Sequence, residues 1–173
     1  MRIELASLEG SENKFVHLYE PGELVLNDER VRLIESPEVS GRILRPGRGI
    51  KVNGRIAGCV EFECDRCLKL IRLPIETEFK LEYVTTEEYQ TFHAAELTEE
   101  ELTLSVFDGE VIDIDEIVRE QLLLAVPSHA VCQTNCKGLC PVCGVDKNLV
   151  DCSCEVSGID LRWAALKELV KDK

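Results

Sequence analysis

The sequence predicts an α+β fold: an antiparallel β-sheet, curled or closed as a barrel, then a helix and a small cysteine-rich zinc module that ends in a second helix. Three observations support this prediction. Residues 50–84 alternate between apolar and polar, residues 113–127 carry apolar residues at helical spacing, and six of the nine cysteines fall within residues 132–154. We expect an antiparallel β domain at 1–84, an acidic loop at 85–109, a helix packed on the sheet at 110–131, and the zinc module with its C-terminal helix at 132–173.

The first half of the sheet is predicted from short β-rich segments. Alternating or β-branched residues lie at 2–7, 14–19 and 39–44. Two apolar segments, 24–26 and 31–34, flank four polar residues, a pattern typical of a hairpin turn.

Two long alternating strands form the second half of the predicted sheet. They cover residues 50–64 and 70–83, and Cys64-Asp-Arg-Cys67 is the turn between them. Gly54 and Gly58 interrupt the first of these strands and are expected to mark bulges or a tight bend.

The helix at 110–131 has a clear beginning and end. Asp113 is an N-cap residue, Glu116 stands where a capping box requires it, and Pro127 ends the apolar pattern. A last helix is expected to start near Asp160, with Trp163 as a packing anchor rather than a base-stacking platform.

Charge is unevenly distributed along the chain. The net charge of −13 argues against a plain electrostatic nucleic-acid binder, because phosphate binding depends on Lys and Arg. Residues 86–120 hold twelve acids and one base, whereas residues 41–55 hold five bases and no acid. Each run is either a solvated surface or a partner-binding face. If the basic run binds RNA, the residues concerned are Arg42, Arg45, Arg48, Lys51 and Arg55.

The cysteine pairs predict metal binding. Cys140-Pro-Val-Cys143-Gly has the form of a zinc knuckle, in which backbone N–H groups point at two thiolates that reach one metal ion. Cys64 and Cys67 form a second CxxC pair. A redox pair would sit at a helix N-terminus after a strand, whereas this pair lies between two strands, so metal binding is favoured.

Eight paired cysteines provide ligands for one or two structural zinc ions. One partition forms a local site from Cys140, Cys143, Cys152 and Cys154, and a second site from Cys64, Cys67, Cys132 and Cys136. A single-zinc alternative leaves the remaining cysteines as free thiols. Cys59 is left over and is expected to be a buried apolar residue.

The sequence gives little support for catalysis or for secretion. The three histidines are scattered, His129 is expected to be a loop residue rather than a ligand, and familiar catalytic motifs are missing. No signal peptide is recognisable and the longest apolar run is residues 122–126, which is too short to span a bilayer. We therefore expect a cytoplasmic, monomeric protein that is not an enzyme, in a compartment where thiols stay reduced.

The sequence resembles the YceD-like family of large ribosomal RNA subunit accumulation proteins. The matching segments are Cys64-Asp-Arg-Cys-Leu68, the helix 112–127, Cys132-x3-Cys136-Lys-Gly-Leu-Cys-Pro-Val-Cys-Gly144, Asn148-Leu149, Cys152-x-Cys154 and 160–167. The resemblance implies a role in synthesis, processing or stability of large-subunit rRNA, and implies no enzymatic activity.

Three functional hypotheses follow. The favoured one is a ribosome-assembly factor whose partner is large-subunit rRNA or a large-subunit ribosomal protein, with no small-molecule substrate and no membrane. The alternative is a redox-switched chaperone that releases zinc on oxidation. A zinc hydrolase is the least favoured, because four thiolates leave no open position on the metal.

Overall fold

The computed structural model of the chain describes residues 1–46, 49–92 and 104–155. These form two compact units. The first contains Met1–Glu63 and Leu70–Ala130, and the second contains Cys64–Lys69 and the described chain from Val131 onward. The turn 64–69, which joins the strands Ile50–Glu63 and Leu70–Thr85, therefore belongs to the cysteine-rich unit.

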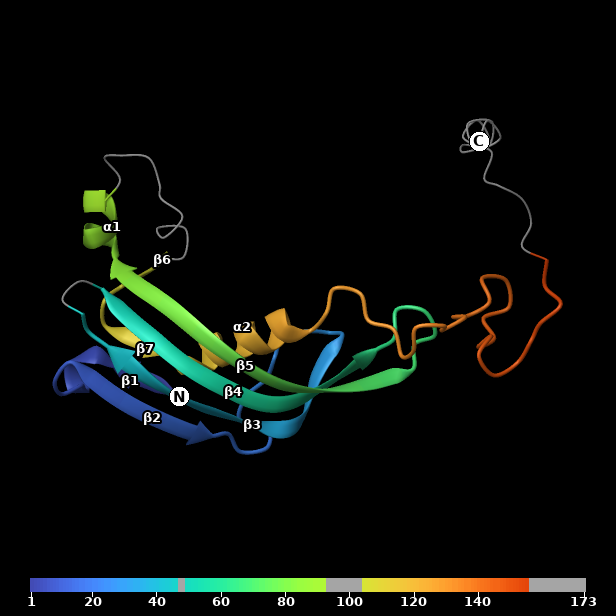
Figure 1. Cartoon of the computed structure of the whole chain (residues 1–173), viewed down its shortest axis with the longest axis horizontal. Coiled ribbons are helices and arrows are strands. Elements are labelled where there is room, and N and C mark those ends of the chain that lie inside the picture. Colours follow the sequence, from blue (N-terminus) through green and yellow to red (C-terminus); the bar gives the residue numbers. More distant parts are fainter. Residues whose placement is uncertain (47–48, 93–103, 156–173) are drawn as a thin grey trace. The chain divides into compact units, whose positions relative to one another are not determined.

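A five-stranded sheet dominates the first unit (Figure 1). Its order is β2-β3-β4-β5-β6, with bounds Glu12–Leu18, Val31–Leu44, Ile50–Glu63, Leu70–Thr85 and Leu104–Phe107. β2 to β5 pair antiparallel, whereas β6 pairs parallel to β5. The sheet is therefore mixed, and its described strands form an open sheet with β2 and β6 at its edges. A closed antiparallel barrel is not what the structure shows.

Two shorter strands and the helix complete this unit. β1 (Arg2–Glu4) pairs antiparallel with β7 (Val111–Asp113), and the 3-10 turn η1 (Leu5–Ser7) follows β1. Helix α2 (Ile114–Ala125) begins directly after β7 and packs against β4, β5 and β1. The carboxylate of Asp113 accepts hydrogen bonds from the backbone N–H groups of Asp115 and Glu116, which confirms the predicted N-cap.

The hydrophobic core lies between α2 and one face of the sheet. Alternation along each strand places every second side chain on this face. The most deeply buried members are Val39, Ile43, Val52, Ile56 and Val60 from the sheet and Ile114, Ile117, Val118 and Leu122 from the helix. The predicted long hairpin is confirmed, because β4 and β5 pair in continuous register from Ile50↔Tyr83 to Glu63↔Leu70.

Gly54 serves close packing rather than the predicted bulge. Gly54 pairs with Gly41 and with Phe79 without a break in register. A Cβ on Gly54 would lie 2.6 Å from Cζ of Phe79, and a Cβ on Gly41 would lie 2.7 Å from Cζ of Phe15. The two rings therefore occupy the space that the glycines leave. The register shifts of the sheet lie in β3 between Leu33 and Glu38. Gly58 lies opposite them, because Ala57 pairs with Glu38 and Cys59 pairs with Glu35, so the expected bulge is found at Gly58 but not at Gly54.

Two sequence-based expectations about loops are wrong. Residues 24–26 form no strand, and Asp28 instead accepts hydrogen bonds from the N–H groups of Arg30 and Val31 at the start of β3. The acidic stretch 85–109 contains α1 (Thr86–Phe92) and β6, not just a loop. Acidic residues suit the first turn of a helix, and β6 is stabilised by pairing with β5, which periodicity does not reveal. The C-terminal helix and Trp163 lie outside the described residues.

Candidate metal centre

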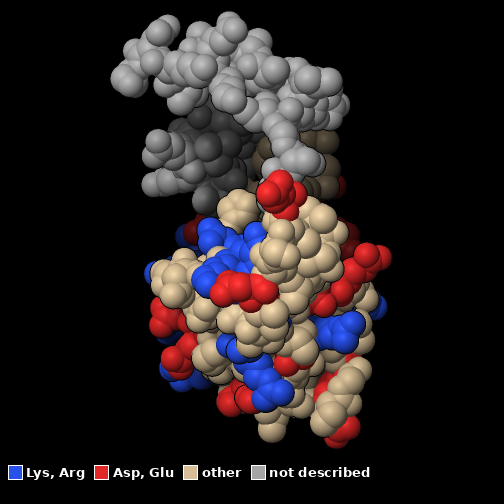
Figure 2. Space-filling model, turned by 90° about the vertical axis from the view of Figure 1, so that its right-hand side faces the viewer, with Lys and Arg blue, Asp and Glu red and all other residues tan. Residues whose placement is uncertain are grey.

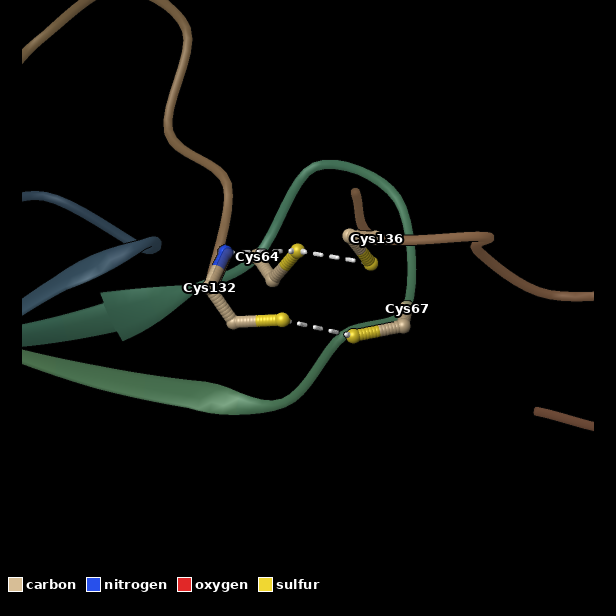
Figure 3. Close-up of side chains that lie close together, drawn as sticks. All are labelled: Cys64, Cys67, Cys132 and Cys136. Carbon is tan, nitrogen blue, oxygen red and sulfur yellow. Dashed lines mark hydrogen bonds between the residues drawn. The ribbon is translucent and has the colours of Figure 1, made fainter. Parts of the chain in front are cut away.

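The first cysteine group consists of Cys64, Cys67, Cys132 and Cys136 (Figure 3). A tight turn presents the first pair: the Cys64 carbonyl accepts from the Leu68 N–H at 3.0 Å, and the Cys64 N–H donates to the Lys69 carbonyl at 2.9 Å. Leu68 adopts a φ of 60°, which a non-glycine residue rarely does. The turn and the loop after Val131 thus bring two pairs of thiols face to face.

The sulfur positions in this group fit a tetrahedral metal ion. Sγ of Cys64 lies 3.9 Å from Sγ of Cys136, and Sγ of Cys67 lies 3.6 Å from Sγ of Cys132. A tetrahedron with a metal–sulfur distance of 2.3 Å has sulfur–sulfur edges of about 3.8 Å. A disulfide would require a separation of about 2.05 Å, and all four cysteines are free. The geometry is therefore that of a metal-binding set rather than of a redox pair.

Backbone and amide N–H groups surround the sulfurs. Sγ of Cys64 accepts from the N–H groups of Arg66 at 3.5 Å and of Cys132 at 3.4 Å. Nδ2 of Asn148 donates to Sγ of Cys136 at 3.4 Å, and the Arg66 guanidinium donates to the Cys136 carbonyl at 2.9 Å. Such donors stabilise thiolates and fix their orientation, as outer-shell groups do in metal sites.

The thiols of this group differ in acidity. Burial raises the pKa of Cys64, but the N–H groups of Cys132, Arg66 and Cys67 outweigh burial and lower the pKa to about 6. Burial, together with the neighbouring cysteines, raises the pKa of Cys132 to about 12. If a cation bound here, Cys64 and Cys132 would both hold it as thiolates, and Cys132 would have to lose its proton on binding.

The second cysteine group consists of Cys140, Cys143, Cys152 and Cys154. Their Sγ atoms also lie within 4.8 Å of one another. The Cys140 carbonyl accepts from the Gly144 N–H at 2.8 Å, which closes the knuckle turn. The N–H groups of Cys143 and Val142 lower the pKa of Cys140 to about 6. This group is more open to solvent than the first, because Cys143 is exposed and Cys152 and Cys154 are half-buried.

One short segment connects the two groups within the cysteine-rich unit. Leu139 forms an isolated antiparallel bridge with Asp146. The side-chain oxygen of Asn148 accepts from the Lys137 N–H at 2.8 Å, and its Nδ2 donates to Asp146 at 2.6 Å as well as to Cys136. Asn148 therefore joins the loop of the second group to a ligand of the first.

The structure thus brings the eight predicted cysteines together as two groups of four, the arrangement of the two-site partition. Both groups could hold a metal ion, and the all-sulfur donor set suits a soft or borderline tetrahedral cation. Four thiolates would fill the coordination sphere of such an ion, so a metal bound here would have no open position for a substrate. Cys59 is buried in β4 and belongs to neither group, and His129 is a member of neither.

The predicted basic residues are only partly gathered on one surface. Arg42, Lys51 and Arg55 project from the same face of the sheet, because Arg42 pairs with Asn53, which is two residues from each of the others along β4. The guanidinium of Arg45 donates to the Leu5 carbonyl, Lys51 pairs with Glu82, and Arg48 lies outside the described residues. Arg42 and Arg55 alone of the five share a hollow on the sheet. On the face shown in Figure 2, basic and acidic side chains are intermingled. Basic and acidic residues are thus less separated on the surface than the sequence predicts, because strand pairing places acidic side chains beside these basic ones.

Comparison with known proteins identifies the family. The sequence profile described as "Large ribosomal RNA subunit accumulation protein YceD" matches residues 52–170. This match covers well over half of the chain. The chain belongs to the YceD family. The matched residues include most of β4, all of β5 and α2, and both cysteine groups.

Bacterial relatives share most of the chain. Uncharacterized protein Rv2926c of Mycobacterium tuberculosis is 31% identical over 129 residues, which are 75% of this chain and 59% of that protein. Uncharacterized protein YlbN of Bacillus subtilis is 27% identical over 159 residues, 91% of this chain and 88% of that protein. This YceD-family chain thus matches about three-fifths of the length of its mycobacterial relative.

A plant relative shares a shorter segment. The large ribosomal RNA subunit accumulation protein YCED homolog 1, chloroplastic, of Zea mays is 42% identical over 45 residues, 25% of this chain and 15% of that protein. No solved structure matches the chain. No helix among the described residues is long and apolar enough to span a membrane.

Proposed function

We propose that this YceD-family chain is a monomeric, non-enzymatic cytoplasmic factor that supports synthesis, processing or stability of large-subunit ribosomal RNA. Its partner in this proposal is the rRNA itself or a large-subunit ribosomal protein. The family description and the name of the maize relative support the link to rRNA. The cysteine groups support a binding or scaffolding role, because all-thiolate centres are structural.

We further propose that the two cysteine groups each hold one zinc ion. The observation that carries this part is that the four sulfurs of each group lie within 4.8 Å of one another, and that two sulfur–sulfur distances of the first group match a zinc tetrahedron. Structural zinc contributes about 10–16 kcal/mol in small modules, so the ions would hold the cysteine-rich unit in its fold.

The test is deletion of the gene in its native cell, followed by complementation. The ratio of large- to small-subunit rRNA should fall in the deletion strain and should recover with the native chain. Cys59→Ser should restore the ratio because Cys59 lies in neither group, whereas Cys64→Ser should not. An unchanged rRNA ratio in the deletion strain would refute the proposed function.

A redox-switched zinc chaperone is the second candidate. The exposure of Cys143 supports it, because an accessible thiolate is the type that oxidants attack. This function requires that peroxide eject zinc and that the oxidised chain suppress aggregation of an unfolded client. Zinc retained under peroxide, together with a lowered rRNA ratio in the deletion strain, would favour the ribosomal role.

A further inference from the structure

A row of polar and basic side chains crosses the outer face of the sheet, opposite the core. Lys14 of β2 pairs with Arg42 of β3, Arg42 pairs with Asn53 of β4, and Asn53 pairs with Lys80 of β5. Residues directly opposite one another in paired strands project from the same face. These four residues, which we call the basic row, therefore form one line across four strands, although they are far apart in the sequence.

The basic row lines a hollow of about 480 Å³. Ser40 and Arg55, which pair with each other in the adjacent line, contribute to the same hollow. Phe79 also borders it, but its side chain is buried on the core side of the sheet. The hollow thus presents cations and small polar groups, and its lining offers no exposed aromatic ring for base stacking.

The lining of the hollow contains more cations than carboxylates. Four cations, Lys14, Arg42, Arg55 and Lys80, line it together with one carboxylate, Glu78. Arg42 reaches Glu12 at 3.6 Å and Arg55 pairs with Glu76, and these side chains are all well exposed, where ion pairs are weak. The described residues supply no ion-pair partner for Lys14 or Lys80.

The cross-strand pairing of two cations in the basic row destabilises the fold. Lys14 and Arg42 stand directly opposite each other, and like charges in cross-strand pairs are destabilising. The chain has 33 acidic residues, yet none of the four positions of the row is acidic, and Glu12 beside Arg42 is the only carboxylate that the described residues pair with the row. A concentration of cations in a chain of net charge −13 indicates a site for a polyanion.

We propose that the basic row binds the phosphate backbone of RNA. The row spans three interstrand spacings, about 14 Å. A stacked strand carries one phosphate per about 3.4 Å of axis, so the row can contact several successive phosphates. Asn53 and Ser40 lie among the cations and can bond to 2′-hydroxyl groups. The choice of RNA over an acidic protein rests on the proposed function.

The basic row differs from the basic run that the sequence indicates. It keeps Arg42, adds Lys14 and Lys80, and leaves out Arg45, whose guanidinium donates to the Leu5 carbonyl. Arg55 and Lys51 lie in the lines on either side of the row, because they are two residues from Asn53 along β4. Binding through phosphates and hydroxyls should depend strongly on salt and weakly on sequence. A structured large-subunit rRNA fragment is therefore the appropriate probe.

The experiment measures binding of the zinc-loaded full chain to a fluorescent transcript of a large-subunit rRNA domain at several salt concentrations. Lys14→Gln with Lys80→Gln removes two phosphate contacts. For a single strand this should reduce the salt slope by about 1.4 and weaken binding about 25-fold at 0.1 M salt. The matched control, Arg32→Gln with Arg72→Gln, removes the same charge from exposed positions outside the row and should bind nearly as the native chain.

Zinc content and thermal unfolding confirm that both double variants are folded. The proposal that the basic row binds RNA would be overturned if the control variant weakened RNA binding as much as Lys14→Gln with Lys80→Gln. It would also be overturned if neither double variant changed RNA binding. If the native chain binds no RNA but captures a large-subunit ribosomal protein, the RNA proposal fails. The proposed function would still stand if the deletion strain has a lowered rRNA ratio, and it fails separately if that ratio is unchanged.

Discussion

Asn148 donates a hydrogen bond from Nδ2 to Sγ of Cys136 at 3.4 Å, although the two residues belong to different loops of the cysteine-rich unit. The same side chain contacts Asp146 and the Lys137 N–H. A single amide thus orients a ligand of the first cysteine group and fixes the segment that leads to the second. Outer-shell residues of this kind typically account for a 10- to 100-fold difference in metal affinity.

Replacing Asn148 with aspartate should weaken metal binding in the first group. The carboxylate would lie beside the Cys136 thiolate and beside Asp146, so a donor becomes a repelling charge. We expect zinc affinity of the first group to fall about 10- to 100-fold, with a smaller fall for Asn148→Ala. Competition with a fluorescent chelator measures the affinity. Equal affinities in Asn148→Asp and the native chain would contradict this role for Asn148.

Gly138 should be sensitive to substitution in a way that Gly144 is not. Both glycines adopt positive φ, 72° and 75°, which an alanine adopts at a cost of about 1 kcal/mol. A Cβ at Gly138 would also lie 2.9 Å from the Arg66 carbonyl, which accepts from the Leu139 N–H, whereas a Cβ at Gly144 would meet nothing within 4 Å. Gly138→Ala should therefore speed zinc release from the first group, and Gly144→Ala should leave that rate unchanged. Equal rates in the two variants would rule out this contact as a support.

The two groups should release their metals at different rates. The first group buries Cys64, Cys67 and Cys136, whereas Cys143 of the second is exposed. Attack by a chelator or an oxidant depends on access to sulfur, so release should be biphasic with the second group first. Cys143→Ser should abolish the fast phase and Cys64→Ser the slow one. A single phase that both variants change equally would contradict the distinction.

The hydrogen bond from Tyr19 to Asp115 should give stability a defined pH dependence. Burial and the Asp115 carboxylate raise the pKa of Tyr19, and the hydroxyl donates to Asp115 at 2.8 Å. Burial raises the pKa of Asp115, but the Met1 ammonium and the Tyr19 hydroxyl outweigh it and lower that pKa. The tyrosine contribution is therefore complete below its ordinary pKa of about 10 and is lost above it, and the aspartate contribution is lost as the pH falls below about 4.

Tyr19→Phe should lower the free energy of unfolding by about 1–2 kcal/mol at pH 7, because Asp115 loses a donor. Above pH 10 the variant should lose stability less steeply than the native chain, since this phenol no longer ionises on unfolding. Urea unfolding at pH 4, 7 and 10.5, followed by circular dichroism, measures both effects. If the free energies of unfolding of Tyr19→Phe and the native chain changed with pH in parallel, the Tyr19–Asp115 hydrogen bond would not cause the pH dependence of stability.

The sequence predicted what depends on local pattern. The apolar side chains of residues 71–83 alternate toward the core face of β5, with Ile75 and Phe79 buried, and Asp113 caps α2 as expected. The two groups of cysteines match one of the partitions that spacing allowed, and the second group is local because a short connection closes cheaply. The alternation, the cap and this local group are encoded by residues close together in the chain, whereas the first group joins two pairs that are 65 or more residues apart.

The features that the sequence did not predict depend on register. The basic row exists because four strands align Lys14, Arg42, Asn53 and Lys80, and no single segment contains that pattern. The parallel pairing of β6 with β5 likewise joins segments that a short acidic stretch separates. Asn148 appears in the sequence only among the residues that carry the family resemblance. Its contact with Cys136 was not predicted, since an asparagine two residues after an aspartate is typical of any turn.

The most direct test of this account is the zinc content of the purified full chain, measured by native mass spectrometry in the native protein and three cysteine variants. The account predicts two zinc ions in the native chain and in Cys59→Ser, and one in each of Cys64→Ser and Cys143→Ser. A native chain that carries no zinc, or a count that neither Cys64→Ser nor Cys143→Ser lowers, would contradict it.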